Sequence, residues 1–221
     1  MIQQQYMARL DKDSLKKYIP EKAVDDMYDL LIAFPVHLKI VKSRKQIRGS
    51  YRRPLQNTIF HQITINNDLN PYVFLITLLH EMAHLHAWAY HRHARHGKTW
   101  KNCFRLLIMQ FLMGDVFPDD IRIALLDHLQ NVLSSDAKDI HLTKILQKYD
   151  VPSAQSDNLT LLEDLPQGSV FSYGTKIMEK KQLRRKYYLC RDVNTNRLYT
   201  FHPLVKVDLI TEKPNIQNIK Q

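Results

Sequence analysis

Cysteine is scarce in this chain of 221 residues, which holds only Cys103 and Cys190. Two thiols so far apart cannot form a disulfide scaffold, and they exclude a zinc ribbon with four cysteine ligands. Internal repeats and low-complexity tracts are also absent. With 44% hydrophobic and 24% charged residues, the composition is that of a folded globular protein rather than a disordered one.

Long apolar runs are missing as well. No stretch approaches the roughly 18 uncharged apolar residues of a transmembrane helix, so we expect no membrane partner. The first residues, MIQQQYMARLDKDSLKKY, contain no apolar segment of the kind found in a secretory signal peptide. These absences predict a cytoplasmic protein, with the nucleoid as a second candidate location.

Acidic side chains are nearly absent from one long segment. Residues 36–105 hold twelve lysines and arginines but only two acidic residues, Asp68 and Glu81. This segment accounts for the formal net charge of +10, because the charges in the rest of the chain cancel. Such a positive field attracts polyanions such as nucleic acid, but an ordinary solvated basic surface has the same composition. Both interpretations stay open.

The first part of the chain mixes helical and strand patterns. Residues 21–34 have the apolar spacing of one helix face, and Pro35 ends that helix. The alternating segments 36–42 and 61–66 are typical of half-buried strands. Between them lies the basic segment 43–53, for which we expect a hairpin.

A long buried helix is expected next. Asn70 is a good N-cap and Pro71 suits the first helical position. The following residues have no glycine or internal proline and are apolar on almost every side, which predicts a buried helix to about residue 91. Another helix should run from Gly97 to about Gly114, and two more helical segments should follow before residue 150.

The pattern changes after residue 150. The polar segment 151–158 has no periodicity, so we expect it to be a linker. Residues 159–211 are rich in valine, tyrosine, phenylalanine and threonine, which predicts three or four short antiparallel strands in a small β module. We expect residues 212–221 to form a flexible tail. The fold class is therefore α+β, with a helical domain and small sheet over residues 1–150 followed by the β module.

Six of the eleven histidines lie between residues 80 and 96, where the chain reads HEMAHLHAWAYHRHARH. His80, Glu81 and His84 match the pattern H-E-x-x-H. Residues four apart lie on the same side of a helix, so two imidazoles can converge on one metal ion. In this pattern zinc activates a water molecule and the glutamate is its general base. The apolar flanks favour a metal site, since ionisable groups in a buried helix need a partner.

A tetrahedral zinc site requires a third protein ligand. His86 lies about 200° round the helix from His84, and His91 lies about 10 Å farther along the axis if the helix continues. His93 would serve only if the helix broke just after Tyr90. His96 precedes Gly97, where a reversal of the chain could return it to the metal. We therefore expect His96 to be the third ligand and the other three to be bystanders.

These residues resemble the SprT-like (Spartan-type) zinc metallopeptidase family. The family shows H-E-x-x-H followed about a dozen residues later by His-Gly-x-x-aromatic, matched here by His96, Gly97 and Trp100. The resemblance covers roughly residues 20–115. It implies a zincin-like core of the minigluzincin type, one Zn²⁺ bound by His80, His84 and His96, and a catalytic Glu81. The zinc ribbon that ends many family members is missing, so the β module is either a degenerate ribbon or a structural lid.

The resemblance implies a zinc-dependent metallopeptidase that hydrolyses peptide bonds, and family members of the Spartan type act on proteins crosslinked to DNA. Basic residues that could contact single-stranded or damaged DNA lie in two groups. They are Arg44, Lys45, Arg48, Arg52 and Arg53, and Arg184, Arg185 and Lys186, the last three preceded by Lys180 and Lys181. A solvated surface explains both groups equally well. The alternatives are a non-proteolytic nucleic-acid-binding or transcription-related factor with a structural zinc, and a general or self-cleaving peptidase.

Overall fold

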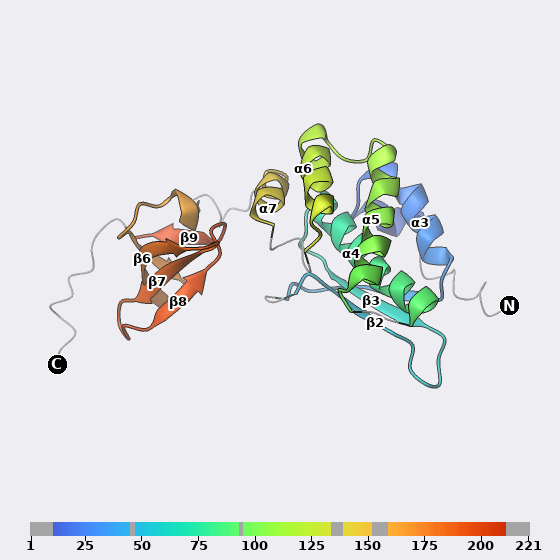
Figure 1. The fold of residues 1–221 in the computed structure, drawn as a ribbon, viewed down its shortest axis with the longest axis horizontal. Helices are drawn as coiled ribbons and strands as arrows, with labels where there is room; N and C mark the ends of the chain where they lie inside the picture. Colours follow the sequence, from blue (N-terminus) through green and yellow to red (C-terminus); the bar gives the residue numbers. More distant parts are fainter. Residues whose placement is uncertain (1–10, 45–46, 93–94, 134–138, 152–158, 211–221) are drawn as a thin grey trace. The chain divides into compact units, whose positions relative to one another are not determined.

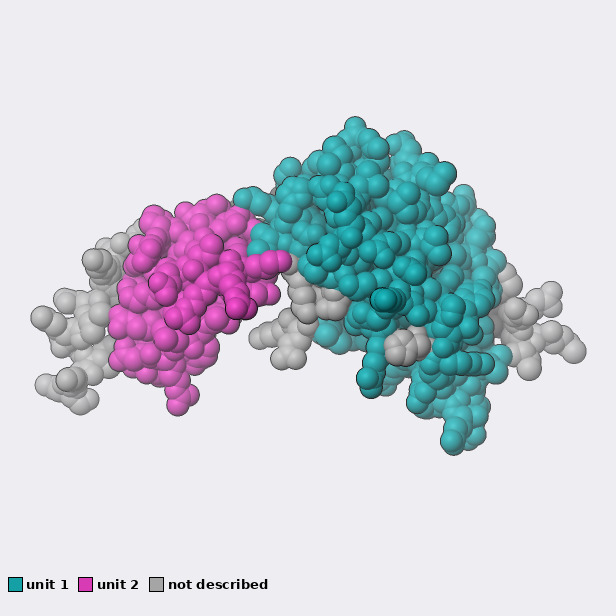
Figure 2. Space-filling view, in the orientation of Figure 1, with its two compact units in different colours: residues 1–150 teal, residues 151–221 magenta. Residues whose placement is uncertain are grey.

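The structure is a computed structural model, and it describes residues 11–44, 47–92, 95–133, 139–151 and 159–210. The chain divides into two compact units, residues 1–150 and 151–221, which Figure 2 colours teal and magenta. In the described part of the chain no helix is both long and apolar enough to cross a bilayer. The expected tail, 212–221, lies outside the described residues, as does the expected linker, 151–158, except for its first residue, Val151.

Unit 1 contains a three-stranded mixed sheet in the order β1 (Val36–Val41), β3 (His61–Asn66), β2 (Gly49–Arg52). The central strand β3 is parallel to β1 and antiparallel to β2. The hairpin expected within residues 43–53 is therefore wrong, since β2 pairs with β3. Ile63 and Ile65 of β3 are fully buried, which accounts for the central place of this strand.

Helix α4 (Pro71–His91) is the element on which unit 1 is built. Figure 1 shows it between the sheet and α5 (Lys98–Met113), and it packs on β2, β3 and α5. The Asn70 side chain caps its start by accepting hydrogen bonds from the backbone N–H groups of Tyr72 and Val73. Arg92 ends it in the left-handed conformation, with φ of 52°. The expected helix is confirmed at both ends.

The other helices of unit 1 surround α4. At the start of the chain lie α2 (Lys12–Lys16), the short 3₁₀ helix η1 (Glu21–Ala23) and α3 (Val24–Ile32). After α5, which ends at Gly114, come α6 (Asp119–Gln130) and α7 (Ile140–Gln147). The buried Asn70 ties α4 to the end of the unit: its amide group donates to the Leu146 carbonyl at 3.0 Å and to Asp150 Oδ1 at 2.7 Å.

Unit 2 is a six-stranded antiparallel sheet. The strands β5 (Val170–Tyr173), β6 (Lys176–Arg184), β7 (Tyr187–Asp192) and β8 (Leu198–Phe201) form a meander. Strand β9 (Lys206–Leu209) returns to pair with β5, and β4 (Leu159–Leu161) pairs with β9. The expected antiparallel module is confirmed, but three or four strands were too few. Strands β4 and β9 have only three and four residues, too short for a clear alternation.

A lysine lies in the interior of unit 2. Lys180 is 3% exposed, and its ammonium group donates to the carbonyls of Leu162, Glu163 and Leu165 at 2.5–3.1 Å. These residues belong to or follow the 3₁₀ helix η3 (Leu162–Asp164). The ammonium also lies 3.9 Å from the centroid of the Tyr188 ring, a cation–π contact. Lys180 thus holds the segment around η3 against the sheet and is not available to contact DNA.

Candidate metal centre

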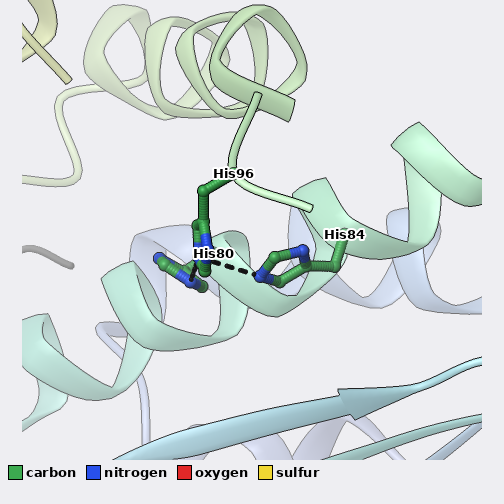
Figure 3. A group of neighbouring side chains, drawn as sticks. All are labelled: His80, His84 and His96. Atoms are coloured by element: carbon green, nitrogen blue, oxygen red, sulfur yellow. Dashed lines mark hydrogen bonds between the residues drawn. The ribbon is translucent and has the colours of Figure 1, made fainter. Parts of the chain in front are cut away.

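Three imidazoles converge on one point in unit 1 (Figure 3). His80 and His84 project from the same side of α4, and His96 reaches them from the segment that precedes α5. The Nε2 atom of His96 lies 3.0 Å from that of His80 and 3.1 Å from that of His84. In the described part of the chain, this is the one group of three or more such side chains placed to hold a metal ion.

The donor set fits a tetrahedral zinc ion. Two nitrogen ligands at about 2.05 Å from a tetrahedral zinc lie about 3.3 Å apart, close to the observed separations. Burial, reinforced by the neighbouring His84 and His96, lowers the pKa of His80 to about 3. His80 is therefore neutral at physiological pH, the state in which an imidazole binds a metal. Three protein ligands would leave a fourth position of a tetrahedral ion for another ligand.

The turn that returns His96 does not depend on the special freedom of glycine. Gly97 has φ of −83° and ψ of −170°, an extended conformation that any residue adopts. It is the N-cap of α5, and its carbonyl accepts the hydrogen bond that opens that helix from the Lys101 N–H at 3.0 Å. His96 is thus placed by the start of α5 rather than by a left-handed glycine turn.

Glu81 lies between α4 and the edge strand β2. Its side chain is 6% exposed, and it faces Gly49, the first residue of β2. A Cβ atom at Gly49 would lie 2.7 Å from Glu81 Oε1 and 2.7 Å from Thr77 Cγ2. No real Cβ contact is so short, so the carboxylate needs glycine at this position of the strand.

Tyr51 and His61 complete the sheet side of the site, and the sequence analysis identified neither. The Tyr51 ring stacks on that of His84 at 6.1 Å, with an interplanar angle of 12°. The Tyr51 hydroxyl and His61 Nδ1 share a hydrogen bond of 2.8 Å. Burial raises the pKa of Tyr51, so this phenol stays protonated. The alternation of β2, which turns residues 49 and 51 towards α4, could have identified Tyr51.

Trp100 forms the opposite wall. Its ring is fully buried, with its centroid 4.6 Å from His80, 5.3 Å from His84 and 4.5 Å from His96. The indole N–H donates to the backbone carbonyl of His80 at 3.4 Å. A rigid aromatic surface in contact with all three imidazoles restricts their orientations, which favours a preformed site.

The remaining histidines of the segment lie elsewhere. His86 is directed towards Phe34, with ring centroids 4.9 Å apart, and burial lowers its pKa. His91 is exposed at the last residue of α4. His93 lies outside the described residues. The two described histidines therefore occupy the bystander positions that helix geometry predicted.

The described basic residues expected to contact DNA are either bonded within the fold or exposed. The guanidinium of Arg44 donates to five acceptors within unit 1, among them Asn66 Oδ1 at 2.9 Å and Thr64 Oγ1 at 3.2 Å, so it holds the sheet together. Arg48 is half-buried, whereas Arg52 and Arg53 are exposed. Lys45 lies outside the described residues. Arg184, Arg185 and Lys186 are exposed together at the turn between β6 and β7.

Comparison with known proteins adds nothing to this geometry: no protein-family model, curated protein or solved structure matches the chain. The arrangement itself comprises three convergent imidazoles, a buried carboxylate one residue from the first of them, and a phenol–imidazole pair beside the second. Such a set can hold one divalent metal and move a proton beside it.

Proposed function

We propose that unit 1 is a zinc-dependent metallopeptidase with a zincin-like fold. The observation that carries the proposal is the convergence of His80, His84 and His96, whose ligand atoms all lie within 4.8 Å of one another, beside a buried Glu81. A purely structural zinc is usually enclosed by four protein ligands and has no need of a neighbouring base. Three ligands and a carboxylate suit hydrolysis better.

The residues divide the chemistry between them. A zinc ion bound by the three imidazoles supplies Lewis acidity, which polarises a peptide carbonyl and acidifies a water molecule. Glu81 accepts a proton from the attacking water and delivers it to the leaving amine. Gly49 leaves room for the Glu81 carboxylate, and Trp100 holds the imidazoles in place. Tyr51 lies beside His84, where its hydroxyl can donate a hydrogen bond to bound substrate.

We also propose that residues 20–115 belong to the SprT-like family and that the substrate is a polypeptide, including proteins associated with or crosslinked to DNA. The motif around His80, Glu81 and His84, together with His96, supports the family. Exposed Arg52 supports contact with DNA, as do Arg184, Arg185 and Lys186 at the β6–β7 turn. A cytoplasmic or nucleoid location agrees with such a substrate.

The test is proteolysis of a loosely folded protein by the zinc-loaded full chain, with and without single-stranded DNA. Glu81→Gln keeps the three imidazoles and removes the base, so cleavage should fall by at least about 100-fold while zinc remains bound. Stimulation by DNA that weakens steeply with salt would support the DNA-associated substrate.

Other outcomes decide between the alternatives. If the wild type binds one zinc per chain and cuts nothing under either condition, the peptidase proposal is wrong and a nucleic-acid-binding factor with structural zinc takes its place. Equal cleavage with and without DNA would leave a general peptidase.

A further inference from the structure

Two arginines share one tryptophan ring at the C-terminal end of α4. The guanidinium carbon of Arg53 lies 4.7 Å from the centroid of the Trp88 ring, and that of Arg92 lies 5.8 Å from it. Both arginines are exposed, and no carboxylate of the described residues forms an ion pair with either. A cation–π contact uses the face of a guanidinium and leaves its N–H edges available.

This pair lies directly beside the metal site. Alternate residues from β2 onwards meet successive turns of α4: Gly49 faces Glu81, Tyr51 stacks on His84, and Arg53 lies over Trp88. Trp88 is one helical turn beyond His84, about 6 Å along the axis. That distance corresponds to about two residues of an extended peptide.

The positive charge of Arg92 also acts on the sheet side of the site. Burial lowers the pKa of His61, and the charge of Arg92 lowers it further. His61 in turn shares a hydrogen bond with Tyr51, whose ring stacks on the metal ligand His84. Both guanidiniums lie against Trp88, one helical turn beyond the metal ligand His84.

The backbone of Arg92 is held in a conformation that arginine adopts only with strain. With φ of 52° it ends α4 in the left-handed region, where glycine is usual. Strain of this kind beside a site makes the residue a candidate for a functional role. The helix end itself would be served better by glycine.

We propose that Arg53 and Arg92, both resting on Trp88, form a subsite for one carboxylate of the substrate, the side chain of an aspartate or glutamate about two residues from the scissile bond. The proposal rests on the peptidase function and specifies its substrate. Each guanidinium can donate paired hydrogen bonds to a planar carboxylate. A nucleic-acid strand carries a charge every ~3.4 Å and would need a longer basic stripe.

The experiment uses a peptide that the zinc-loaded wild type cleaves, with glutamate or glutamine placed in turn at each position on both sides of the scissile bond. Glutamate at one position should raise kcat/KM about tenfold over glutamine. Arg53→Gln and Arg92→Gln should each reduce this ratio, and the double variant should abolish it. Arg122→Gln, an exposed arginine of α6 paired with Asp119, is the matched control and should leave the ratio unchanged.

Arg92→Gly separates the side chain from the helix end. Glycine relieves the left-handed backbone, so unit 1 should be at least as stable, whereas the glutamate preference should fall as in Arg92→Gln. If the preference for glutamate is absent at every position, or survives in the double variant, the subsite proposal is wrong although the peptidase function stands.

A binding measurement keeps the subsite testable if no peptide is cleaved. Fluorescently labelled glutamate and glutamine peptides are titrated into zinc-loaded Glu81→Gln, and the same tenfold preference is expected. Failure of cleavage alone would then count against the peptidase function, and equal binding of both peptides against the subsite. An oligonucleotide that binds through Arg53 and Arg92 more tightly than the glutamate peptide would assign the site to nucleic acid and overturn the proposal.

Discussion

Unit 2 buries the ammonium group of Lys180 and surrounds it with three carbonyls and an aromatic ring. Unit 1 instead buries His84 and Glu81, and three of its imidazoles converge on one point. Both arrangements place polar groups where desolvation is costly. In unit 2 the protein itself satisfies the charge. In unit 1 the Nε2 atom of His96 shares hydrogen bonds with those of His80 and His84, and a bound cation would instead accept a lone pair from each imidazole.

The arginines of unit 1 repeat this contrast on a smaller scale. Arg44 donates hydrogen bonds to five acceptors of the sheet, whereas the one contact found for the Arg53 guanidinium among the described residues is with the face of Trp88. A saturated polar group stabilises the fold, while a preformed but unsaturated arrangement is available for a ligand. This distinction separates structural from functional positions better than residue type does.

The largest effect should come from removing one convergent imidazole. His96→Ala takes away a ligand without touching the core, so zinc affinity should fall about 100-fold or more while the secondary structure persists. Competition with a chromophoric zinc chelator measures the affinity, and circular dichroism checks the fold. His91→Ala is the control: it removes an exposed histidine of the same segment and should leave zinc affinity unchanged. Equal losses from both variants would overturn the ligand assignment.

A smaller effect, on the stability of unit 2, should follow from removing the buried ammonium group of Lys180. Lys180→Met keeps the length of the side chain but leaves three buried carbonyls without their donor, which should destabilise unit 2 by about 2 kcal/mol. Both tryptophans lie in unit 1, so hydrogen exchange of the β6–β7 amides is the better measurement. Zinc affinity should not change. Lys176→Met, at the exposed start of β6, is the control. Equal destabilisation by the two variants would show that the buried contacts of Lys180 do not stabilise unit 2.

The smallest effect, on the rate of cleavage, should come from a substitution that displaces the Glu81 carboxylate. Gly49→Ala places a Cβ 2.7 Å from Glu81 Oε1, so the carboxylate must shift while the imidazoles keep their places. We expect cleavage to slow about tenfold, as a misplaced catalytic group allows, with zinc affinity unaltered. Gly114→Ala, where the nearest atom would lie at an ordinary 3.6 Å, serves as the control. An unchanged rate in Gly49→Ala would show that Glu81 does not act from its observed position.

Much of the fold was predictable where local signals agree. Helix α4 and strand β3 have the expected bounds, because the Asn70–Pro71 cap and the alternation of residues 61–66 act within a few residues. The partner of β2 was not predictable, since pairing with β3 rather than within a hairpin depends on contacts distant in sequence. The short strands β4 and β9 were not predicted for the same reason. Their pairing with distant strands makes them strands, and their own residues show no strand pattern.

The metal ligands were predictable because helical spacing alone brings His80 and His84 together. The surroundings of the site were not. Gly49, Tyr51 and Arg53 reach α4 from a different element, and nothing in the spacing of β2 says which turn of the helix each one meets. The sequence also could not separate Arg44 from Arg53, since the five acceptors around Arg44 come together only in the folded sheet.

Asn70 has a consequence for how unit 1 folds. The amide that caps the helix carrying two of the imidazoles donates to residues 76 and 80 positions later, at the end of α7. Closing that loop is slow and entropically costly, so the ligand-bearing helix is secured only when the last helix docks. A fragment limited to residues 20–115 would hold every ligand and the base, yet it would lack the contacts that make unit 1 one cooperative body.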